Sequence, residues 1–569
     1  MYNKLGTQLI LSLDTDILTR EKSYELNIGY DKAFRLWELI IRYTGELETL
    51  LEDYGLIGTK LLGGFAIVAI REDKIREFAL DNRVIYIEQS KAFVDNRASI
   101  AGFNQSCMSV PYFDMNLRGN GIYVAIIDSG IDIYHPDFFI EDNGIKYTKI
   151  AALWDQTQDG NPPYGYNVGT LYTREDINVL INSESNNIYQ EELGSNSMSI
   201  SRDISGHGTA VAGIVAACTP SAQLIIVKLD TSGREETDTI SLMLGIDFAV
   251  RFAIDNSVPL VVNLSYGNNS GDHNGNSVLE RYIDAVSVMA KSTFVVGAGN
   301  DGASGGHVQI NMGNESWYKR EFFVNQGESG ISILVWRKTQ DVADIFLTTP
   351  NGNVIGPFND YDNIMSYQLE DMVVKVINSG PTPINVMQET YISIIPVDGF
   401  IREGVWSISF NPKRIIDGRF DVWLPVSGST NSEVYFLSPT ASTTLTIPAT
   451  AENVITVGAY NQNTLSFAPF SGRGYTVDGN VKPDILAPGV NIDTASAGGG
   501  YELVTGTSFA TPFVSSAAAM LMEYGIVNGN DLFLYGEKVK AYLIAAARPL
   551  LDFNSYPNNQ SGWGALCVV

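Results

Sequence analysis

The stretch that decides the fold is Gly506-Thr-Ser-Phe-Ala-Thr-Pro512, which continues into the small and apolar residues 513–521. This pattern predicts a buried helix that begins at or just before Ser508. Pro512 is compatible with the helix start, because first-turn N–H groups have no intrahelical partner. A serine at a helix N-terminus could attack a carbonyl carbon while its own N–H holds the resulting oxyanion. On this stretch alone, a plain N-cap serine explains the pattern equally well.

Two other stretches carry residues of complementary chemistry. Residues 124–127 form an unbroken apolar run, typical of a strand buried on both faces, which ends in Asp128 and a turn glycine. His207 opens a second small-residue helix, Gly-His-Gly-Thr-Ala-Val-Ala-Gly. The chain order Asp128, His207, Ser508 is that of subtilisin, and it differs from the orders in chymotrypsin and the α/β-hydrolases.

Together these motifs resemble the subtilase family of serine proteases, and Val295-Val-Gly-Ala-Gly-Asn300 resembles the family's strand that ends in an oxyanion-binding asparagine. The resemblance implies a parallel α/β sheet with helices on both faces. It assigns Ser508 as nucleophile, His207 as general base and Asp128 as the residue that orients the histidine. The Asn300 side chain and the Ser508 N–H would form the oxyanion hole. A substrate would add as a strand along a cleft that is bordered by Leu264, Ser265, Tyr266, Gly267, Ala298 and Gly299.

The first 95 residues are predicted to form an α+β unit in the order β-α-β-β-α-β. The expected strands lie at 37–43, 60–70 and 84–88, and the expected helices lie at 46–53 and 72–80. This order resembles the ferredoxin-like subtilase prodomain, an intramolecular chaperone and inhibitor whose tail lies in the cleft. Roughly 7–10 extended residues at ~3.3 Å each would carry that tail to Ser508. We therefore expect self-cleavage within 91–99, near Asn96.

The spacing between Asn300 and Ser508 is far longer than a minimal subtilase requires. Within 305–440, five alternating runs lie at 331–336, 345–348, 391–395, 405–410 and 420–424, and turn signals separate them. They predict an inserted all-β sandwich of the jelly-roll kind. A rigidifying brace is favoured over a carbohydrate- or partner-binding module. The predicted organisation is a prodomain at 1–95, a catalytic domain at 96–304 and 441–569, and the insert at 305–440.

Composition restricts the partners. The net charge of −27 disfavours nucleic acid and anionic membranes, and no apolar run approaches the ~18 residues that would span a bilayer. No signal peptide is visible, because the apolar run 9–13 is short and acidic residues follow it. We therefore expect a cytoplasmic or spore-associated protein whose partners are a protein substrate and its own cleaved prodomain.

Metal and disulfide chemistry is not expected. Three cysteines are too few and too scattered for a disulfide framework or a zinc site. The loop at 218–223 is shorter than the one with which secreted subtilisins help to bind calcium. We predict no metal and no cofactor, although the sequence leaves calcium open.

His135 is expected to be structural, and His273 is expected to be a solvated loop residue. Residues 146–203 are expected to form a surface loop on the cleft rim.

Three features narrow the resemblance to the clostridial germination-specific (Csp) proteases. They are the missing signal, the complete prodomain and the β-sandwich. That resemblance implies limited proteolysis of a precursor, such as a spore cortex-lytic pro-enzyme. Two alternatives remain open: a non-catalytic pseudoprotease of the same fold, and a general intracellular or exported subtilisin. All three triad positions are filled here, which favours the enzyme.

Overall fold

The computed structural model describes residues 2–97, 117–183, 201–231, 236–359 and 364–567. Its centre is a nine-stranded sheet in the order β11-β10-β12-β7-β14-β16-β28-β29, with β30 also paired to β28. The strands from β10 to β28 and β30 are parallel, and β11 and β29 are antiparallel edges. The central parallel strands are β10 (Ile150–Asp155), β12 (Gln223–Lys228), β7 (Tyr123–Asp128), β14 (Leu260–Leu264), β16 (Ser292–Gly297) and β28 (Val454–Asn461). The short strands beside them are β11 (Thr170–Thr173), β29 (Ser466–Phe467) and β30 (Ile485–Pro488).

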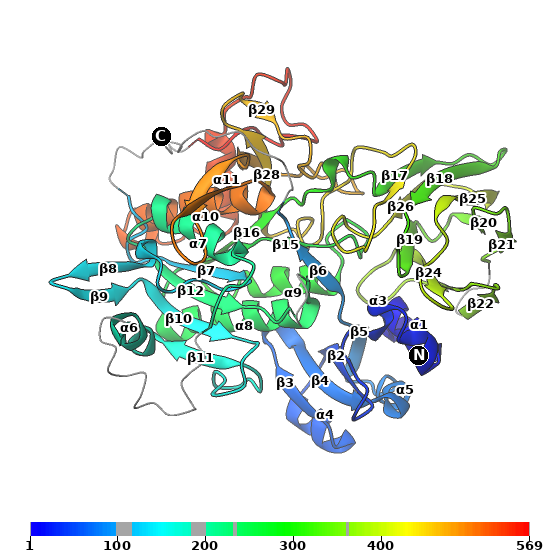
Figure 1. Cartoon of the computed structure of the whole chain (residues 1–569), viewed down its shortest axis with the longest axis horizontal. Coiled ribbons are helices and arrows are strands. Elements are labelled where there is room, and N and C mark those ends of the chain that lie inside the picture. Colours follow the sequence, from blue (N-terminus) through cyan, green and yellow to red (C-terminus); the bar gives the residue numbers. More distant parts are fainter. Residues whose placement is uncertain (1, 98–116, 184–200, 232–235, 360–363, 568–569) are drawn as a thin grey trace.

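Helices cover both faces of this sheet, as predicted (Figure 1). One face packs on α7 (His207–Cys218), α10 (Thr507–Met522), α11 (Glu537–Ala546) and α6 (Arg174–Ser183). The other face packs on α8 (Thr239–Asn256) and α9 (Val278–Val286). Because both faces are covered, the strands can be apolar throughout, and the run at 124–127 is buried as expected.

The N-terminal unit contains the predicted β-α-β-β-α-β order. Its antiparallel sheet runs β1-β2-β4-β3, with β5 also paired to β2. The elements are β1 (Tyr30–Asp31), β2 (Leu36–Tyr43), α4 (Leu47–Tyr54), β3 (Ile57–Lys60), β4 (Phe65–Arg71), α5 (Ile75–Phe78) and β5 (Val84–Gln89). Three short helices before them were not predicted: α1 (Thr7–Asp14), α2 (Ile17–Arg20) and α3 (Tyr24–Asn27).

Strands occur at all five runs predicted within 305–440. A six-stranded antiparallel sheet has the order β17-β26-β19-β24-β23-β22, and a five-stranded one has the order β21-β20-β25-β18-β27. Both sheets contribute to one apolar core. The strands are β17 (His307–Asn311), β18 (Tyr318–Val324), β19 (Ile331–Arg337), β20 (Val342–Thr348), β21 (Val354–Ile355), β22 (Ile364–Gln368), β23 (Met372–Ser379), β24 (Gln388–Pro396), β25 (Gly404–Arg414), β26 (Arg419–Trp423) and β27 (Val434–Phe436).

The N-terminal unit and the six-stranded sheet share a core that the sequence did not predict. One apolar cluster joins residues of α1, β2 and β4 to Leu334, Trp336, Ile377, Tyr391, Ile395 and Trp423. Figure 1 shows α1 beside β24, and the Tyr391 hydroxyl donates to Glu25 at 2.8 Å. The two units are therefore packed together directly.

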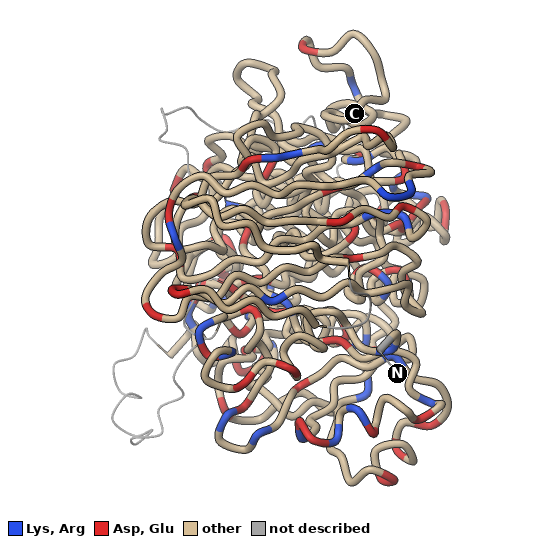
Figure 2. The backbone as a smooth tube through the Cα atoms, turned by 90° about the vertical axis from the view of Figure 1, so that its right-hand side faces the viewer, with Lys and Arg blue, Asp and Glu red and all other residues tan. Residues whose placement is uncertain are grey.

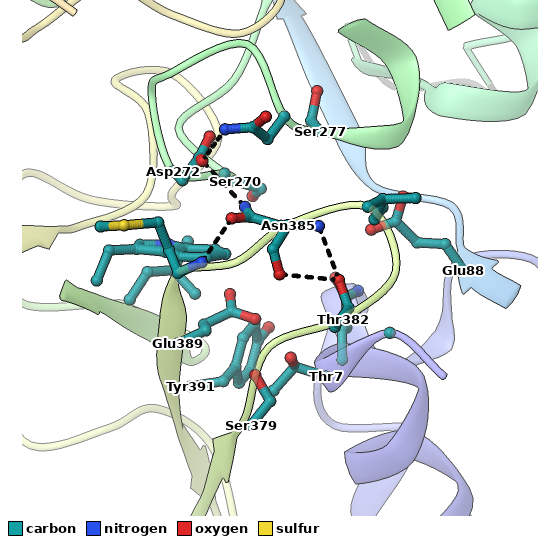
Figure 3. Close-up of a pocket in the computed structure, with 18 of the residues that line it drawn as sticks. Thr7, Glu88, Ser270, Asp272, Ser277, Ser379, Thr382, Asn385, Glu389 and Tyr391 are labelled. Carbon is teal, nitrogen blue, oxygen red and sulfur yellow. Dashed lines mark hydrogen bonds between the residues drawn. The ribbon is translucent and has the colours of Figure 1, made fainter. Parts of the chain in front are cut away.

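A polar pocket lies where the N-terminal unit, the α/β sheet region and the six-stranded sheet meet (Figure 3). Its labelled residues are Thr7, Glu88, Ser270, Asp272, Ser277, Ser379, Thr382, Asn385, Glu389 and Tyr391. Asn385 Nδ2 donates to Asp272 Oδ2 at 3.0 Å, and burial raises the pKa of Glu389. Polar contacts therefore accompany the apolar ones at this junction.

Two predictions about surface residues were wrong. Residues 146–203 are not simply a surface loop, because they include β10, where Trp154 is fully buried. His273 is not solvated. It is fully buried, and its ring stacks on Trp423 with a centroid distance of 4.1 Å. His307 also stacks on Trp423, at 4.8 Å. The first error overlooked an apolar strand within a long, mostly polar segment. The second arose because a short polar turn is covered by a distant part of the chain, Trp423.

Charged residues lie interspersed along the chain. In the view of Figure 2, acidic and basic residues are mixed in the outer turns of the described chain. No helix in the described ranges is long and apolar enough to cross a membrane.

The buried imidazole of His273 makes stability depend on pH. Burial lowers its pKa from the ordinary value of 6.5 to about 4. As pH falls below 6.5, the unfolded chain binds a proton that the folded chain does not bind until about pH 4. Stability is therefore full above pH 6.5 and decreases toward pH 4, by up to about 1.4 kcal/mol per pH unit.

His273→Phe should keep the ring stacking and remove this titration. In a Ser508→Ala background, chemical denaturation at pH 7.5 and 4.5 should find the variant less stable at pH 7.5. The stability difference from the parent should shrink by roughly 2 kcal/mol at pH 4.5. A difference that does not change with pH would contradict the assignment.

Candidate active site

The predicted triad residues converge at the carboxyl edge of the parallel sheet. Asp128 is the last residue of β7, His207 the first residue of α7, and Ser508 lies in the first turn of α10. Carboxyl ends of parallel strands share one edge, where the N-termini of following helices also lie. All three side chains are at most 1 % exposed, so the site excludes bulk water.

Asp128 and His207 form a close buried pair. His207 Nδ1 lies 2.7 Å from Asp128 Oδ1, and the Ser129 N–H also donates to that oxygen at 2.7 Å. Burial lowers the pKa of His207, but the charge and hydrogen bond of Asp128 outweigh it, so the pKa is raised overall. Nδ1 faces the carboxylate, which leaves Nε2 buried without a hydrogen-bond partner among the described residues. Nε2 is therefore available to take a proton.

The Ser508 hydroxyl donates to the Ser265 carbonyl at 3.2 Å. In this conformation it makes no hydrogen bond to His207 within the described chain. Rotation about χ1 of Ser508 changes the direction of this hydroxyl, and hydrogen bonds between catalytic groups often tighten only as the reaction proceeds. The triad residues are thus together, but the Ser508 hydroxyl points to the Ser265 carbonyl and not to His207.

The two residues predicted for the oxyanion hole differ in their contacts. The Ser508 N–H donates to the Asn96 carbonyl at 3.3 Å. Asn300 Oδ1 accepts from the Thr507 N–H and hydroxyl, both at 3.1 Å. This pair of bonds fixes the Asn300 amide, and its Nδ2 is buried and unpartnered in the described chain. Asn300 lies beyond the end of β16 rather than on it.

The tail of the N-terminal unit occupies the predicted cleft. β6 (Ala92–Asp95) lies between β13 (Glu236–Asp238) and β15 (Tyr266–Gly267) in a three-stranded antiparallel sheet. The Asn96 N–H donates to the Ser265 carbonyl at 3.0 Å, and Arg97 bridges to Gly506. The Asn96 carbonyl therefore lies against Ser508, within the segment predicted for self-cleavage.

The predicted cleft residues divide into two groups. Ser265, Tyr266 and Gly267 pair with the tail, and Leu264 precedes them at the end of β14. Ala298 and Gly299 contact Thr446 instead: the Ala298 carbonyl accepts its N–H at 3.1 Å. A Cβ on Gly299 would lie 2.4 Å from Thr446 Oγ1. Ala298 and Gly299 therefore contact the segment around Thr446 and do not pair with the tail.

Several site residues were missed by sequence reasoning. They are the second cleft strand β13, Thr446, Asp203 and Thr507. Of these, Thr507 holds the Asn300 side chain by a hydrogen bond. Only Asp203 carried a signal, since an acidic residue just before a helix start is a common cap. The other contacts join segments far apart in the chain.

Asp203 organises the start of α7. Its carboxylate accepts from Ser129 Oγ, Gly206 N, Thr209 N and Thr209 Oγ1 at 2.7–2.9 Å. It therefore joins the loop after Asp128 to the first turn of the His207 helix. An anion also stabilises a helix N-terminus.

Within the described residues, no cluster of three or more His, Cys, Asp or Glu could hold a metal.

Two protein-family models and a solved structure match this chain. The subtilase family model matches residues 119–333 and 369–564, and a model of the Csp protease B prodomain matches residues 3–91. The solved structure of the Clostridium perfringens CspB protease is 33% identical in sequence to this chain and aligns with a TM-score of 0.71. The alignment covers 80% of this chain and 93% of that one.

The PIII-type proteinase of Lactococcus lactis subsp. cremoris (strain SK11) is 24% identical over 491 aligned residues, and the match covers 77% of this chain and 24% of that protein. A PI-type proteinase of the same subspecies is 25% identical over 491 residues. The chain spans about a quarter of the length of these curated relatives.

Asp203→Ala should loosen the start of α7. Loss of four hydrogen bonds that satisfy buried groups should lower the free energy of unfolding by about 2–3 kcal/mol. In an otherwise wild-type chain, self-processing should slow because His207 loses its fixed position. Stability is measured by denaturation in a Ser508→Ala background, with the exposed Glu141→Ala as control. Equal stability of the two variants would contradict the role of Asp203.

Proposed function

Because the chain belongs to the subtilase family of serine proteases, we propose that it is an endopeptidase that first cleaves itself between Asn96 and Arg97. One observation carries this proposal: the Asn96 carbonyl accepts the Ser508 N–H while its strand is held on both sides. That is the arrangement of a substrate bound across a nucleophile.

Ser508, His207 and Asp128 have distinct roles in the reaction. His207 Nε2 takes the proton of Ser508 Oγ as that oxygen bonds to the Asn96 carbonyl carbon. The Ser508 N–H and Asn300 Nδ2 hold the resulting oxyanion. His207 then gives its proton to the Arg97 nitrogen, which leaves, and water hydrolyses the Asn96 ester. Asp128 keeps the histidine in the right tautomer and stabilises its cation.

This function goes with the predicted organisation into a prodomain, a catalytic domain that ends at 304 and resumes at 441–569, and a jelly-roll insert at 305–440. Cleavage after Asn96 would move the predicted end of the prodomain from residue 95 to residue 96. The cleaved prodomain remains bound, because three contacts outlast the bond. They are the β6 pairing, the shared core with the insert, and the Leu62 N–H on the buried Asp247 at 2.7 Å. The insert thus acts as a brace for the prodomain.

The substrate is a protein precursor activated by limited proteolysis in the cytoplasm or the spore. The likeness to CspB favours a germination role, with a cortex-lytic pro-enzyme as the substrate class. A pseudoprotease of the same fold is the alternative. The buried pairing of Asp128 with His207 supports the enzyme. A phosphonate probe distinguishes the two, because only the enzyme is labelled at Ser508.

Ser508→Ala should abolish self-cleavage and leave the fold intact, since it removes one hydroxyl whose partner is a backbone carbonyl. Mass spectrometry of the wild type should find two fragments that separate after Asn96, and the variant should remain whole. A wild-type chain that stays whole, or a Ser508→Ala chain that is still cut in a protease-deficient host, would refute the proposal.

Asn300→Ala should slow self-cleavage by about 10²–10³-fold, because the oxyanion loses one of two donors. The rate is followed on the newly synthesised chain by gel. Asn314→Ala is a suitable control, since its amide contacts Ile415 in the insert, far along the chain from the triad. An Asn300→Ala rate equal to the control rate would contradict the assignment of Asn300.

A further inference from the structure

The tail of the N-terminal unit carries a carboxylate beside the bond that is proposed to break. Asp95 Oδ1 accepts a hydrogen bond from the Arg97 N–H at 3.0 Å. This nitrogen is the atom that would leave the Asn96 carbonyl carbon, and the Asn96 carbonyl is the one that accepts the Ser508 N–H. Asp95 therefore contacts a reacting atom, although it belongs to the tail and not to the triad.

Strand pairing fixes the side on which this carboxylate lies. Asp95 is the last residue of β6, and it lies directly opposite Tyr266 of β15 in an antiparallel pair. Opposed residues of such a pair project to the same face of the sheet. The Tyr266 ring packs edge-on against the His207 ring, with a centroid distance of 6.0 Å. Asp95 thus lies on the face of the tail that is directed toward His207.

The residue that would leave is also held in place. Arg97 Nη2 donates to the Ser205 carbonyl at 3.2 Å, and the Arg97 backbone bridges to Gly506. Ser205 Oγ in turn accepts from the His207 N–H at 3.3 Å. The segments that precede α7 and α10 therefore hold Arg97 while the hydrogen of its backbone nitrogen is directed at Asp95.

The charges around His207 are consistent with this position. Burial lowers the pKa of His207, whereas the charge of Asp128 raises it. The charge of Asp95 raises this pKa as well, and the charge of Arg97 lowers it. A negative charge near an imidazole favours its protonated form. Asp95 is therefore a second carboxylate that stabilises a cation at His207 in the uncleaved chain.

We propose that the prodomain supplies Asp95 as an additional catalytic group for its own removal. The Asp95 carboxylate holds the hydrogen of the Arg97 nitrogen and stabilises the positive charge that moves from His207 to this nitrogen. The bonds that form and break are those of the triad reaction, and Asp95 neither gains nor loses a proton. The inference rests on the proposed function, because it takes Asn96–Arg97 as the bond that breaks.

The contact between Asp95 and the Arg97 nitrogen should strengthen as the reaction proceeds. The nitrogen becomes more positive as the C–N bond breaks and the proton from His207 arrives, so its N–H becomes a stronger donor. Hydrogen bonds to a carboxylate are stronger than those to a neutral oxygen. Only an interaction that is stronger in the transition state than in the bound chain accelerates the reaction. A neutral acceptor at position 95 would give less of this stabilisation.

Asp95→Asn separates the charge from the shape, because an amide oxygen can still accept from the Arg97 N–H. It should slow self-cleavage roughly tenfold, since a charge-assisted hydrogen bond becomes a neutral one. Asp95→Ala should be slower still, because it also removes the acceptor. The rates are measured on the full-length chain by a time course of in vitro synthesis. Asp31→Asn is the matched control, because Asp31 Oδ1 accepts from the Ala33 N–H, also two residues along the chain, at 2.8 Å.

The pH dependence of self-cleavage distinguishes a catalytic carboxylate from one that only forms a turn. Cleavage requires neutral His207, so the rate falls at acidic pH as the imidazole binds a proton. Because Asp95 raises the pKa of His207, Asp95→Asn should move this fall to lower pH, and Asp31→Asn should leave it in place. The profiles are measured in an Asn300→Ala background, in which slow cleavage lets each chain fold before it reacts.

An Asp95→Asn chain that is cut as fast as its parent, or whose pH profile does not move, would overturn the inference and leave the proposed function standing. Denaturation in a Ser508→Ala background shows whether the variant folds. If it does not fold, Asp95→Ser replaces it with the same expectations, because serine keeps a short neutral acceptor. A wild-type chain that is not cut between Asn96 and Arg97 would overturn both the inference and the proposed function.

Discussion

The pairing of β6 between β13 and β15 is the constraint on which the rest of the structure depends. It places Asp95 opposite Tyr266 and Val94 opposite both Gly267 and Glu236. Because side chains alternate along a strand, a shift by one residue would turn every side chain of the tail to the other face. The register therefore selects which carbonyl meets the Ser508 N–H and which side chain lies between Gly267 and Gly297.

The groups around that carbonyl are fixed before any reaction begins. The N-termini of α7 and α10 lie at the same edge of the sheet, so their backbone dipoles favour negative charge there. Asp203 fixes the first of these helices, and Thr507 fixes the Asn300 amide. Each acts through a side chain that is itself buried and hydrogen-bonded. Preorganised donors of this kind need little rearrangement as charge develops.

The N-terminal unit is held by surfaces of different chemical character. Its tail is held by backbone hydrogen bonds. The turn between β3 and β4 meets α8, because the Leu62 N–H donates to Asp247, which also accepts from Tyr166 and Tyr282. Its helices pack on the six-stranded sheet in a common apolar core. Cleavage of one peptide bond would break none of these contacts. Such a prodomain would leave the cleft only after local unfolding or digestion, so the catalytic domain would remain inhibited until then.

The sequence by itself determined the parallel α/β fold, because buried strands and small-residue helices leave patterns within a single segment. It also located Asp128, His207 and Ser508, and the strands within 305–440. Only the tertiary structure decided the burial of His273, the core shared by α1 and β24, and the roles of Asp203, Thr507 and Thr446. These features depend on contacts between segments distant in the chain, and a threonine or histidine has the same local pattern whether water or another segment covers it.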